Sequence, residues 1–268
     1  MMHDPDIKLN APAVFAEAPV DIVSKHYTFI PTTTLIDDFR KLGWHVERAN
    51  QQKSRIDPIH TKHKVVFRSN AFPAINGIFP ELIVTNSHDR TAAFNFLLGL
   101  FRLACLNGLV VADKILEDLR IRHIGYEFEA VKELTHTMME NMPRVIQTIT
   151  RLERVVLTDD QAFEFAVKAI AQRFTEYQLS NGNVNTKAIT DAIDVPAFLL
   201  PRRAEDNNPS VWAVYNRIQE QLTKGGFQRI GTKDEISKRV RPITNIKLDI
   251  DVNKSLWSLA NSYAEVAA

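Results

Sequence analysis

The stretch from Glu81 to Val111 is the most apolar part of the chain, and it constrains the fold more than any other segment. It opens with the β-branched run Leu82 to Thr85, which predicts a strand. After a polar turn, Thr91 to Leu106 is long and apolar enough to predict a buried helix, and an Asn-Gly pair then suits its end. Leu109 to Val111 predicts a second strand. We therefore expect a strand, a buried central helix and a strand at the centre of the fold.

The expected helix has few polar positions, and they are spaced by four, four and three residues: Thr91, Asn95, Gly99 and Arg102. On a helix this spacing forms one narrow stripe. A polar stripe headed by the free N–H groups of a helix N-terminus could hold a phosphate or a carboxylate. In the alternative interpretation, Gly99 permits close packing, and Arg102 either extends its charged end to solvent or pairs with an internal acid.

The composition is that of an ordinary globular protein, with 268 residues, 45% hydrophobic and 24% charged. The single cysteine, Cys105, excludes an intramolecular disulfide and suits a reducing compartment. A secretory signal and a run of eighteen apolar residues are both missing from the sequence. We expect a cytoplasmic protein with no membrane partner.

The first half of the chain favours strands and the second half favours helices, which predicts an α+β fold with an antiparallel sheet. Residues 1–20 lack periodicity and suggest a surface arm; 21–268 would form one domain, sheet-rich over 21–125 and mainly helical over 126–268. In the first half we further expect a strand at His26–Ile30, a helix at Leu35–Leu42 and strands at Trp44–Ala49 and Lys64–Arg68. In the second half we expect a helical region from Glu127 to about Val156 broken at Pro143, a helix opened by a capping box at Thr158 and Gln161, and a surface loop at Asp194–Pro209. Two more helices are expected at Ser210–Thr223 and from Leu248, the latter with Asp251 as N-cap.

The formal net charge is only +1, but two segments of the chain are strongly basic. One runs from Arg48 to Arg68 and the other from Leu222 to Lys247. Lys62, Lys64 and Arg68 share parity on an extended strand, so their side chains would project from one face of the sheet. With Trp44 and Phe72 nearby, such a face would suit single-stranded nucleic acid; the alternative is a solvated outer sheet face.

These landmarks together resemble the phage/plasmid-like family known as domain of unknown function 932. The resemblance rests on the segment from Asn86 to Val111, with its Asn-Ser-His-Asp turn, Phe-Arg pair and Cys-x-Asn-Gly close. Where the family usually has glycine after the aspartate, this chain has Arg90. Other landmarks follow in the family's order: Ala11–Ala16, Ser24–Thr32, Gly43-Trp44, Val65–Arg68, Tyr215–Glu220, Gly225-Gly226, Arg241-Pro242 and Asn253–Trp257. The resemblance implies a protein of phages, prophages or conjugative plasmids, often encoded near genes for DNA recombination or defence evasion.

The turn Asn86, Ser87, His88 and Asp89 holds the residue types of a hydrolase triad, but adjacent residues rarely reach the required geometry. We expect the turn to cap the central helix instead. His60, His63, His88 and Asp89 could make a metal site, although that spacing alone is weak evidence. The sequence holds neither a Walker loop nor GxGxxG. We therefore predict no catalytic residue, metal or cofactor.

Our leading hypothesis is a non-enzymatic protein that binds DNA, preferably single-stranded, in the recombination or replication of a mobile element, where annealing proteins act as homo-oligomers. The expected DNA-binding residues are Lys62, Lys64, Arg68, Arg90, Arg102, Lys238, Arg239 and Arg241. Two alternatives remain. One is an inhibitor that binds a host defence protein through the acidic region from Ala112 to Glu164, and the other is a metal-dependent nuclease or hydrolase.

Overall fold

The computed structural model describes residues 1–20, 29–75, 77–89, 95–102, 107–111, 128–231 and 236–266. The chain divides into two compact units, Met1–Pro143 and Arg144–Ala268, where one domain had been expected. The boundary expected near residue 125 lies outside the described residues, and so does most of the strand expected at His26–Ile30. Each unit is described by itself.

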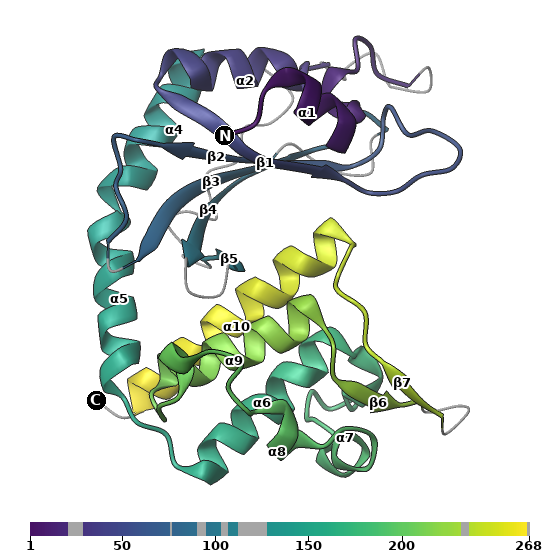
Figure 1. Cartoon of the computed structure of the whole chain (residues 1–268), viewed down its shortest axis with the longest axis vertical. Coiled ribbons are helices and arrows are strands. Elements are labelled where there is room, and N and C mark those ends of the chain that lie inside the picture. Colours follow the sequence, from purple (N-terminus) through teal and green to yellow (C-terminus); the bar gives the residue numbers. More distant parts are fainter. Residues whose placement is uncertain are drawn as a thin grey trace. The chain divides into compact units, whose positions relative to one another are not determined.

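The first unit is built on a five-stranded antiparallel meander, in which each strand pairs with the one before it (Figure 1). The strands are β1 (Trp44–Gln51), β2 (His63–Ser69), β3 (Ile78–Asn86), β4 (Asn95–Arg102) and β5 (Asn107–Val110). The strands expected around β1, β2, β3 and β5 are confirmed. With the helical second unit, this sheet confirms the α+β class.

The buried central helix expected over Thr91–Leu106 is wrong, because Asn95–Arg102 is the strand β4, paired with both β3 and β5. Residues 90–94 and 103–106 lie outside the described residues. Leu97 and Leu98 point to opposite faces of the sheet and both are buried. A strand buried on both faces is apolar at every position, and periodicity alone cannot distinguish it from a buried helix. The expected polar stripe is lost, since Gly99 and Arg102 lie on opposite faces.

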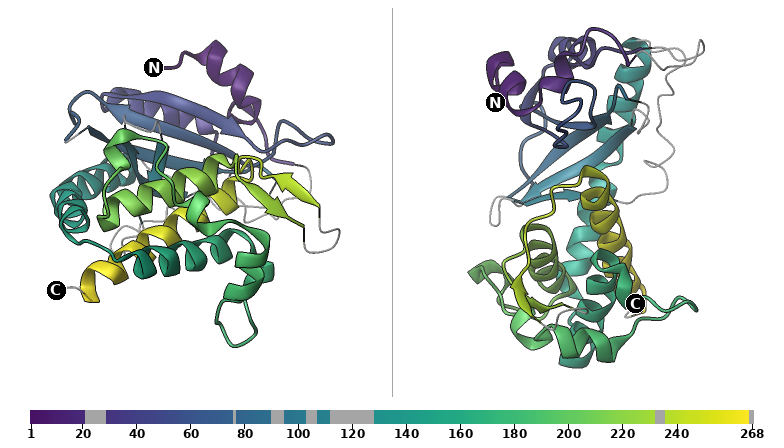
Figure 2. Two further views of the ribbon diagram at one scale, coloured as in Figure 1. Left: turned by 60° about the horizontal axis from the view of Figure 1, so that its bottom comes forward. Right: turned by 90° about the vertical axis from the view of Figure 1, so that its right-hand side faces the viewer.

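Helices cover one face of the sheet (Figures 1 and 2). They are α1 (Asp4–Asn10), the 3₁₀ turn η1 (Pro12–Phe15) and α2 (Thr32–Lys41), and α4 (Phe128–Glu140) completes the unit. The expected surface arm is thus packed, because Ile7 and Val14 have no exposed surface. Phe39 of α2 has its ring centroid 4.5 Å from that of Phe67 on β2, which joins helix to sheet. Gly43 has a φ of 80° and ends α2 as expected.

The second unit is helical, with one small hairpin. Its elements are α5 (Met142–Arg154), α6 (Asp159–Arg173), η2 (Thr175–Tyr177), α7 (Thr186–Ala192), α8 (Val195–Phe198), η3 (Ala204–Asp206), α9 (Val211–Lys224), β6 (Gln228–Ile230), β7 (Ser237–Arg239) and α10 (Ile246–Val266). Helices α6, α9 and α10 pack together, and Tyr215 of α9 meets Trp257 of α10 edge to face with centroids 6.2 Å apart. The expected loop at Asp194–Pro209 contains the short helices α8 and η3.

The helix ends in the second unit follow local capping chemistry. The capping box is confirmed, since Gln161 N donates to Thr158 Oγ1 over 3.2 Å and Thr158 N donates to Gln161 Oε1 over 2.9 Å. The break expected near Pro143 is confirmed between α4 and α5. The cap expected at Asp251 is wrong: α10 begins at Ile246, and Asn245 Oδ1 accepts from Leu248 N over 3.0 Å. In the described part of the chain, the helices are too short or too polar to cross a membrane.

Candidate nucleic-acid interface

The face of the sheet opposite α2 carries an ion-pair cluster. Strand alternation places Lys64 and Arg68 on this face and Val65 and Phe67 against α2, as the sequence predicts. Arg68 Nη2 donates to Glu81 Oε1 over 2.7 Å and Nη1 donates to Glu47 Oε1 over 3.3 Å. Only 13% of the Arg68 side chain is exposed. Arg68 is therefore engaged in ion pairs within the first unit. A phosphate could bind it only in competition with Glu47 and Glu81.

Sequence reasoning missed the other members of this cluster. Arg48 Nη2 also donates to the buried carboxylate of Glu81. The Arg68 guanidinium lies 4.4 Å from the ring centroid of Phe79 and 4.9 Å from that of Phe101. Phe79 pairs with Phe101 across β3 and β4. Assigning both segments to paired strands would have placed Phe79, Glu81 and Phe101 on one face, but β4 had been assigned to a helix.

The other residues of the first unit that were expected to bind DNA do not share one environment. Arg102 is 8% exposed and projects on the α2 side of the sheet, whereas Lys62 and Lys64 are half-buried. Arg90 lies outside the described residues. Trp44 is 3% exposed, with its centroid 5.6 Å from that of Phe72, so it belongs to the core and not to a base-stacking face.

The Asn-Ser-His-Asp turn belongs to a buried polar cluster at the end of β3. Asn86 Nδ2 donates to Thr32 Oγ1 over 3.1 Å, and Thr32 Oγ1 lies 2.8 Å from His63 Nε2. The rings of His63 and His88 have centroids 5.1 Å apart. Burial lowers the pKa of His63 to about 4, so its imidazole is neutral at pH 7. Because β4 is a strand, Asn86 to Asp89 do not cap the expected helix; they tie β3 to the start of α2.

The structure does not gather the four residues of the metal hypothesis. His60 Nδ1 lies 2.7 Å from Asp57 Oδ2, and His60 Nε2 lies 3.1 Å from the carbonyl oxygen of Ala18. His63 and His88 are adjacent, but three or more metal-binding side chains do not converge anywhere in the described ranges.

The second basic segment contains the β6–β7 hairpin, which projects from the helices of the second unit (Figures 1 and 2). Lys238, Arg239 and Arg241 are all exposed. From β6, Arg229 pairs with Glu176 of η2 over 2.7 Å, and its guanidinium lies 4.3 Å from the ring centroid of Phe174. Lys238 and Arg239 therefore lie on the hairpin itself, which the inward-facing Arg229 anchors, and Arg241 lies just beyond the end of β7.

The Gly225-Gly226 pair brings further arginines to the base of this hairpin. Both glycines have positive φ, 67° and 97°, a conformation that side chains rarely adopt. Arg202 Nη2 donates to the carbonyl oxygen of Gly225 over 2.8 Å. A Cβ atom on Gly226 would lie 3.2 Å from Arg202 Nη2 and 3.6 Å from Arg239 Nη2. Two guanidiniums thus converge beside a backbone without a side chain.

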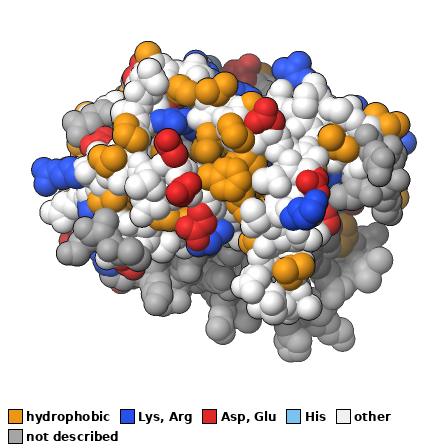
Figure 3. Space-filling view, turned by 90° about the horizontal axis from the view of Figure 1, so that it is seen from below, with side chains coloured by type: hydrophobic (Ala, Val, Ile, Leu, Met, Phe, Trp, Pro, Cys, Tyr) orange, Lys and Arg blue, Asp and Glu red, His pale blue; other side chains and the backbone are white. Residues whose placement is uncertain are grey.

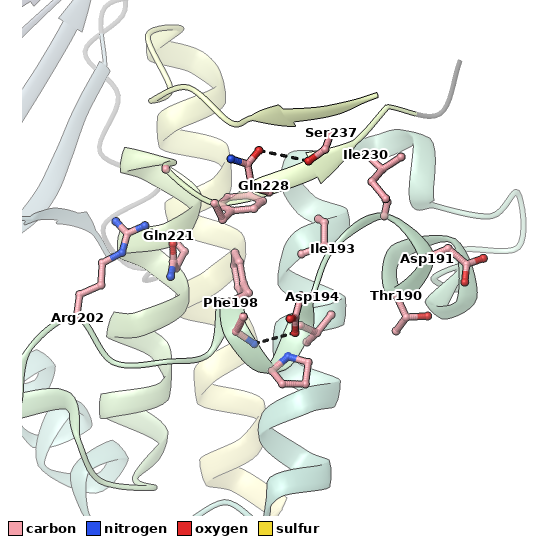
Figure 4. A pocket seen from close by; sticks show the side chains of 16 residues that line it. Thr190, Asp191, Ile193, Asp194, Phe198, Arg202, Gln221, Gln228, Ile230 and Ser237 are labelled. Atoms are coloured by element: carbon pink, nitrogen blue, oxygen red, sulfur yellow. Dashed lines mark hydrogen bonds between the residues drawn. The ribbon is translucent and has the colours of Figure 1, made fainter. Parts of the chain in front are cut away.

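A pocket of about 790 Å³ opens next to this point (Figure 4). Its lining includes the rings of Phe198 and Phe227, whose centroids lie 5.0 Å apart with the rings almost perpendicular. Arg202 and Gln221 lie at one side, and Thr190 and Asp191 of α7 lie at the other (Figure 4). Polar groups and aromatic rings therefore share one hollow beside the converging arginines.

The charges on one face of the molecule are mixed (Figure 3). On the face in Figure 3, acidic, basic and apolar side chains lie side by side, and among the described side chains there neither charge forms a continuous field. This agrees with the net charge of +1. A phosphate-binding surface on this protein would consequently be local.

Comparison with known proteins identifies the family. Two relatives from Escherichia coli (strain K12) match over 255 residues, which is 94% of this chain and 87% of each relative. They are UPF0380 protein YafZ, at 32% identity, and UPF0380 protein YfjQ, at 31%. Solved structures give no significant match. The family model described as "Domain of unknown function (DUF932)" matches residues 19–257, so the chain belongs to the DUF932 family.

Proposed function

We propose that this protein binds single-stranded DNA through the β6–β7 hairpin, as a binding protein and not as an enzyme. The observation that carries the proposal is the exposure of Lys238 and Arg239 on the projecting hairpin and of Arg241 just beyond the end of β7. Cations on a protruding hairpin can approach a phosphate backbone closely, and each contact releases bound counterions from the nucleic acid.

The arrangement at Gly226 distinguishes this surface from an ordinary solvated one. Arg202 and Arg239 direct guanidinium nitrogens toward the same point, although like charges repel. An anion beside the two guanidiniums would offset that repulsion and could accept a charge-assisted hydrogen bond from Arg239. Arg202 Nη2 already donates to Gln221 Oε1 and to the Gly225 carbonyl, so Arg202 would attract the anion through its charge. The β6–β7 surface therefore offers both exposed cations and a defined phosphate position.

A single strand suits this surface better than a duplex. Aromatic rings line the hollow beside the arginines, and only unpaired bases can present their own ring faces to them. The two strands of the hairpin have three residues each, which gives a short contact along any nucleic acid. A useful affinity would then come from several copies acting together on one strand.

The biological setting is the second part of the proposal. The family resemblance favours a role in recombination or replication of a phage or plasmid, in the cytoplasm, where annealing proteins work as homo-oligomers on single strands. Lys62 and Lys64 of the first unit would add contacts, whereas Arg68 serves the fold. A host protein that binds instead of DNA is the outcome to expect if nucleic-acid binding fails.

The test is fluorescence anisotropy with labelled single-stranded and double-stranded oligonucleotides of equal length, measured over a salt series. Parallel titrations with added manganese and with chelator separate metal-dependent binding. We expect micromolar or tighter binding of the single strand that weakens steeply with salt. Failure to bind at low salt, or tighter binding of the duplex, would overturn the proposal.

A further inference from the structure

We propose that the pocket beside Gly226 takes one unstacked nucleobase of a bound strand, while the adjoining phosphate lies between Arg202 and Arg239. This inference rests on the proposed single-strand binding and specifies its chemistry. It assigns the recognition of the base to a hollow that is separate from the exposed cations of the hairpin.

The lining of the pocket fits a small aromatic ligand. Its volume of about 790 Å³ is typical of sites for drug-sized ligands and leaves ample room for one base, so the lining carries the assignment. Ile193 and Ile230 contribute apolar surface. Gln228 and Ser237 add an amide and a hydroxyl, which can donate to and accept from the edge of a base. A charged or purely apolar ligand would leave part of this lining unmatched.

The ring of Phe227 is the expected stacking platform. Its orientation is fixed from two sides, because Phe198 meets it at 87° and Phe174 meets it at 82° with centroids 6.4 Å apart. Phe198 is buried, whereas Phe227 is half-buried and lines the pocket. A braced, accessible ring can stack on a base with little loss of side-chain entropy.

The pocket is electrically polarised, which orients the ligand. Gln221 Oε1 accepts from Arg202 Nη2, so the guanidinium is held at one side of the pocket (Figure 4). At the other side, Asp191 pairs with Lys187 over 2.6 Å, and Asp194 caps α8 through Ala197 N over 3.0 Å. A phosphate is attracted to the Arg202 side. On the aspartate side, Lys187 offsets the charge of Asp191, so no cation among the described residues that line this side draws a phosphate into the hollow itself. The base then points away from the arginines into the hollow.

The experiment compares two probes that carry the same number of phosphates: an oligothymidine and an oligonucleotide of equal length in which every nucleotide is abasic. The full-length protein should bind oligothymidine roughly tenfold more tightly, which is the free energy of about one stacked base. Phe227→Leu and Gln228→Ala should each lower this ratio and leave the affinity for the abasic strand unchanged. Phe163→Leu is the matched control, since Phe163 is also half-buried but does not line the pocket.

The outcomes separate the two proposals. Equal affinity of the wild-type protein for both probes would overturn the base pocket and leave single-strand binding intact. Binding of neither probe would overturn both. If Phe227→Leu does not fold, as circular dichroism would show, the Gln228→Ala variant decides, because Gln228 is exposed on the hairpin. An unchanged ratio in that variant would count against the pocket.

Discussion

Arg68 Nη2 lies 2.7 Å from Oε1 of Glu81, a carboxylate with no exposed surface. Arg48 reaches the other carboxylate oxygen, so one buried acid holds two cations on the sheet. A buried charge is tolerated only when such partners replace its lost hydration. Arg68 is thus committed to the stability of the first unit.

The first prediction concerns this cluster. Glu81→Gln should lower the free energy of unfolding by about 3–5 kcal/mol, because two arginines lose their buried counter-charge. Urea denaturation measures the change. Glu47→Gln is the control, since Glu47 is partly exposed and its loss should cost less than about 1 kcal/mol. Equal effects of the two substitutions would contradict the assigned role.

This prediction also changes how DNA binding can be tested in the first unit. Charge reversal at Arg68 would place a third acid beside Glu81 and Glu47, so lost binding could reflect unfolding.

The second prediction concerns Gly99, which lies beside Glu81 on the neighbouring strand. A Cβ atom there would lie 2.7 Å from Ile83 Cδ1, closer than side chains pack. Gly99→Ala should therefore destabilise the protein by about 1–3 kcal/mol. Ile83→Val removes the Cδ1 methyl and leaves Cγ1, which would lie 2.9 Å from the new Cβ, so the double variant should recover only part of the loss. Gly108→Ala is the matched control, because its nearest contact is Arg48 Nη2 at 3.4 Å.

Thermal denaturation of the four variants measures these effects. If the clash is real, the double variant should lose less unfolding free energy than the sum of the losses in the two single variants. Strict additivity of Gly99→Ala and Ile83→Val would contradict the packing described.

The third prediction is a pH dependence that arises from His63. Its pKa is about 4 in the folded protein, against an ordinary value of 6.5, because burial disfavours the imidazolium. Between these values the unfolded chain binds the proton and the folded chain does not. The stability that the neutral, buried His63 contributes is therefore fully present above pH 6.5. As the pH falls toward 4, the free energy of unfolding drops by on the order of 3 kcal/mol.

His63→Gln removes this titration. The difference in unfolding free energy between wild type and variant should therefore shrink as pH falls from 7 to 4. Chemical denaturation at several pH values tests it. A constant difference over that range would show that His63 does not carry the effect.

The fourth prediction concerns the hairpin. Neutralising Lys238, Arg239 and Arg241 together to glutamine should weaken single-strand binding and reduce the slope of log K against log salt by about 2. The slope counts phosphate contacts, so it distinguishes lost ion pairs from lost folding. Arg154→Gln, on the exposed end of α5, is the control. It should change the slope by less than the loss of one phosphate contact would. An unchanged slope in the triple variant would remove the hairpin from the interface.

Local chemistry in the sequence was enough to predict much of the fold. The capping box at Thr158, the helix that starts after Ser210 and the parity of β2 all depend on residues near one another in the chain. Sequence reasoning failed at Thr91–Leu106, because burial on both sides of the sheet removed the alternation that marks a strand.

The sequence by itself determined the α+β class, most of the helix and strand positions and the two basic segments. Only the tertiary structure decided which cations are available. It placed Arg48 and Arg68, 33 and 13 residues from Glu81, on one buried carboxylate. It also brought Arg202 and Arg239 together at Gly226. The physical reason is that charge and burial act through space, whereas residue patterns report only neighbours along the chain.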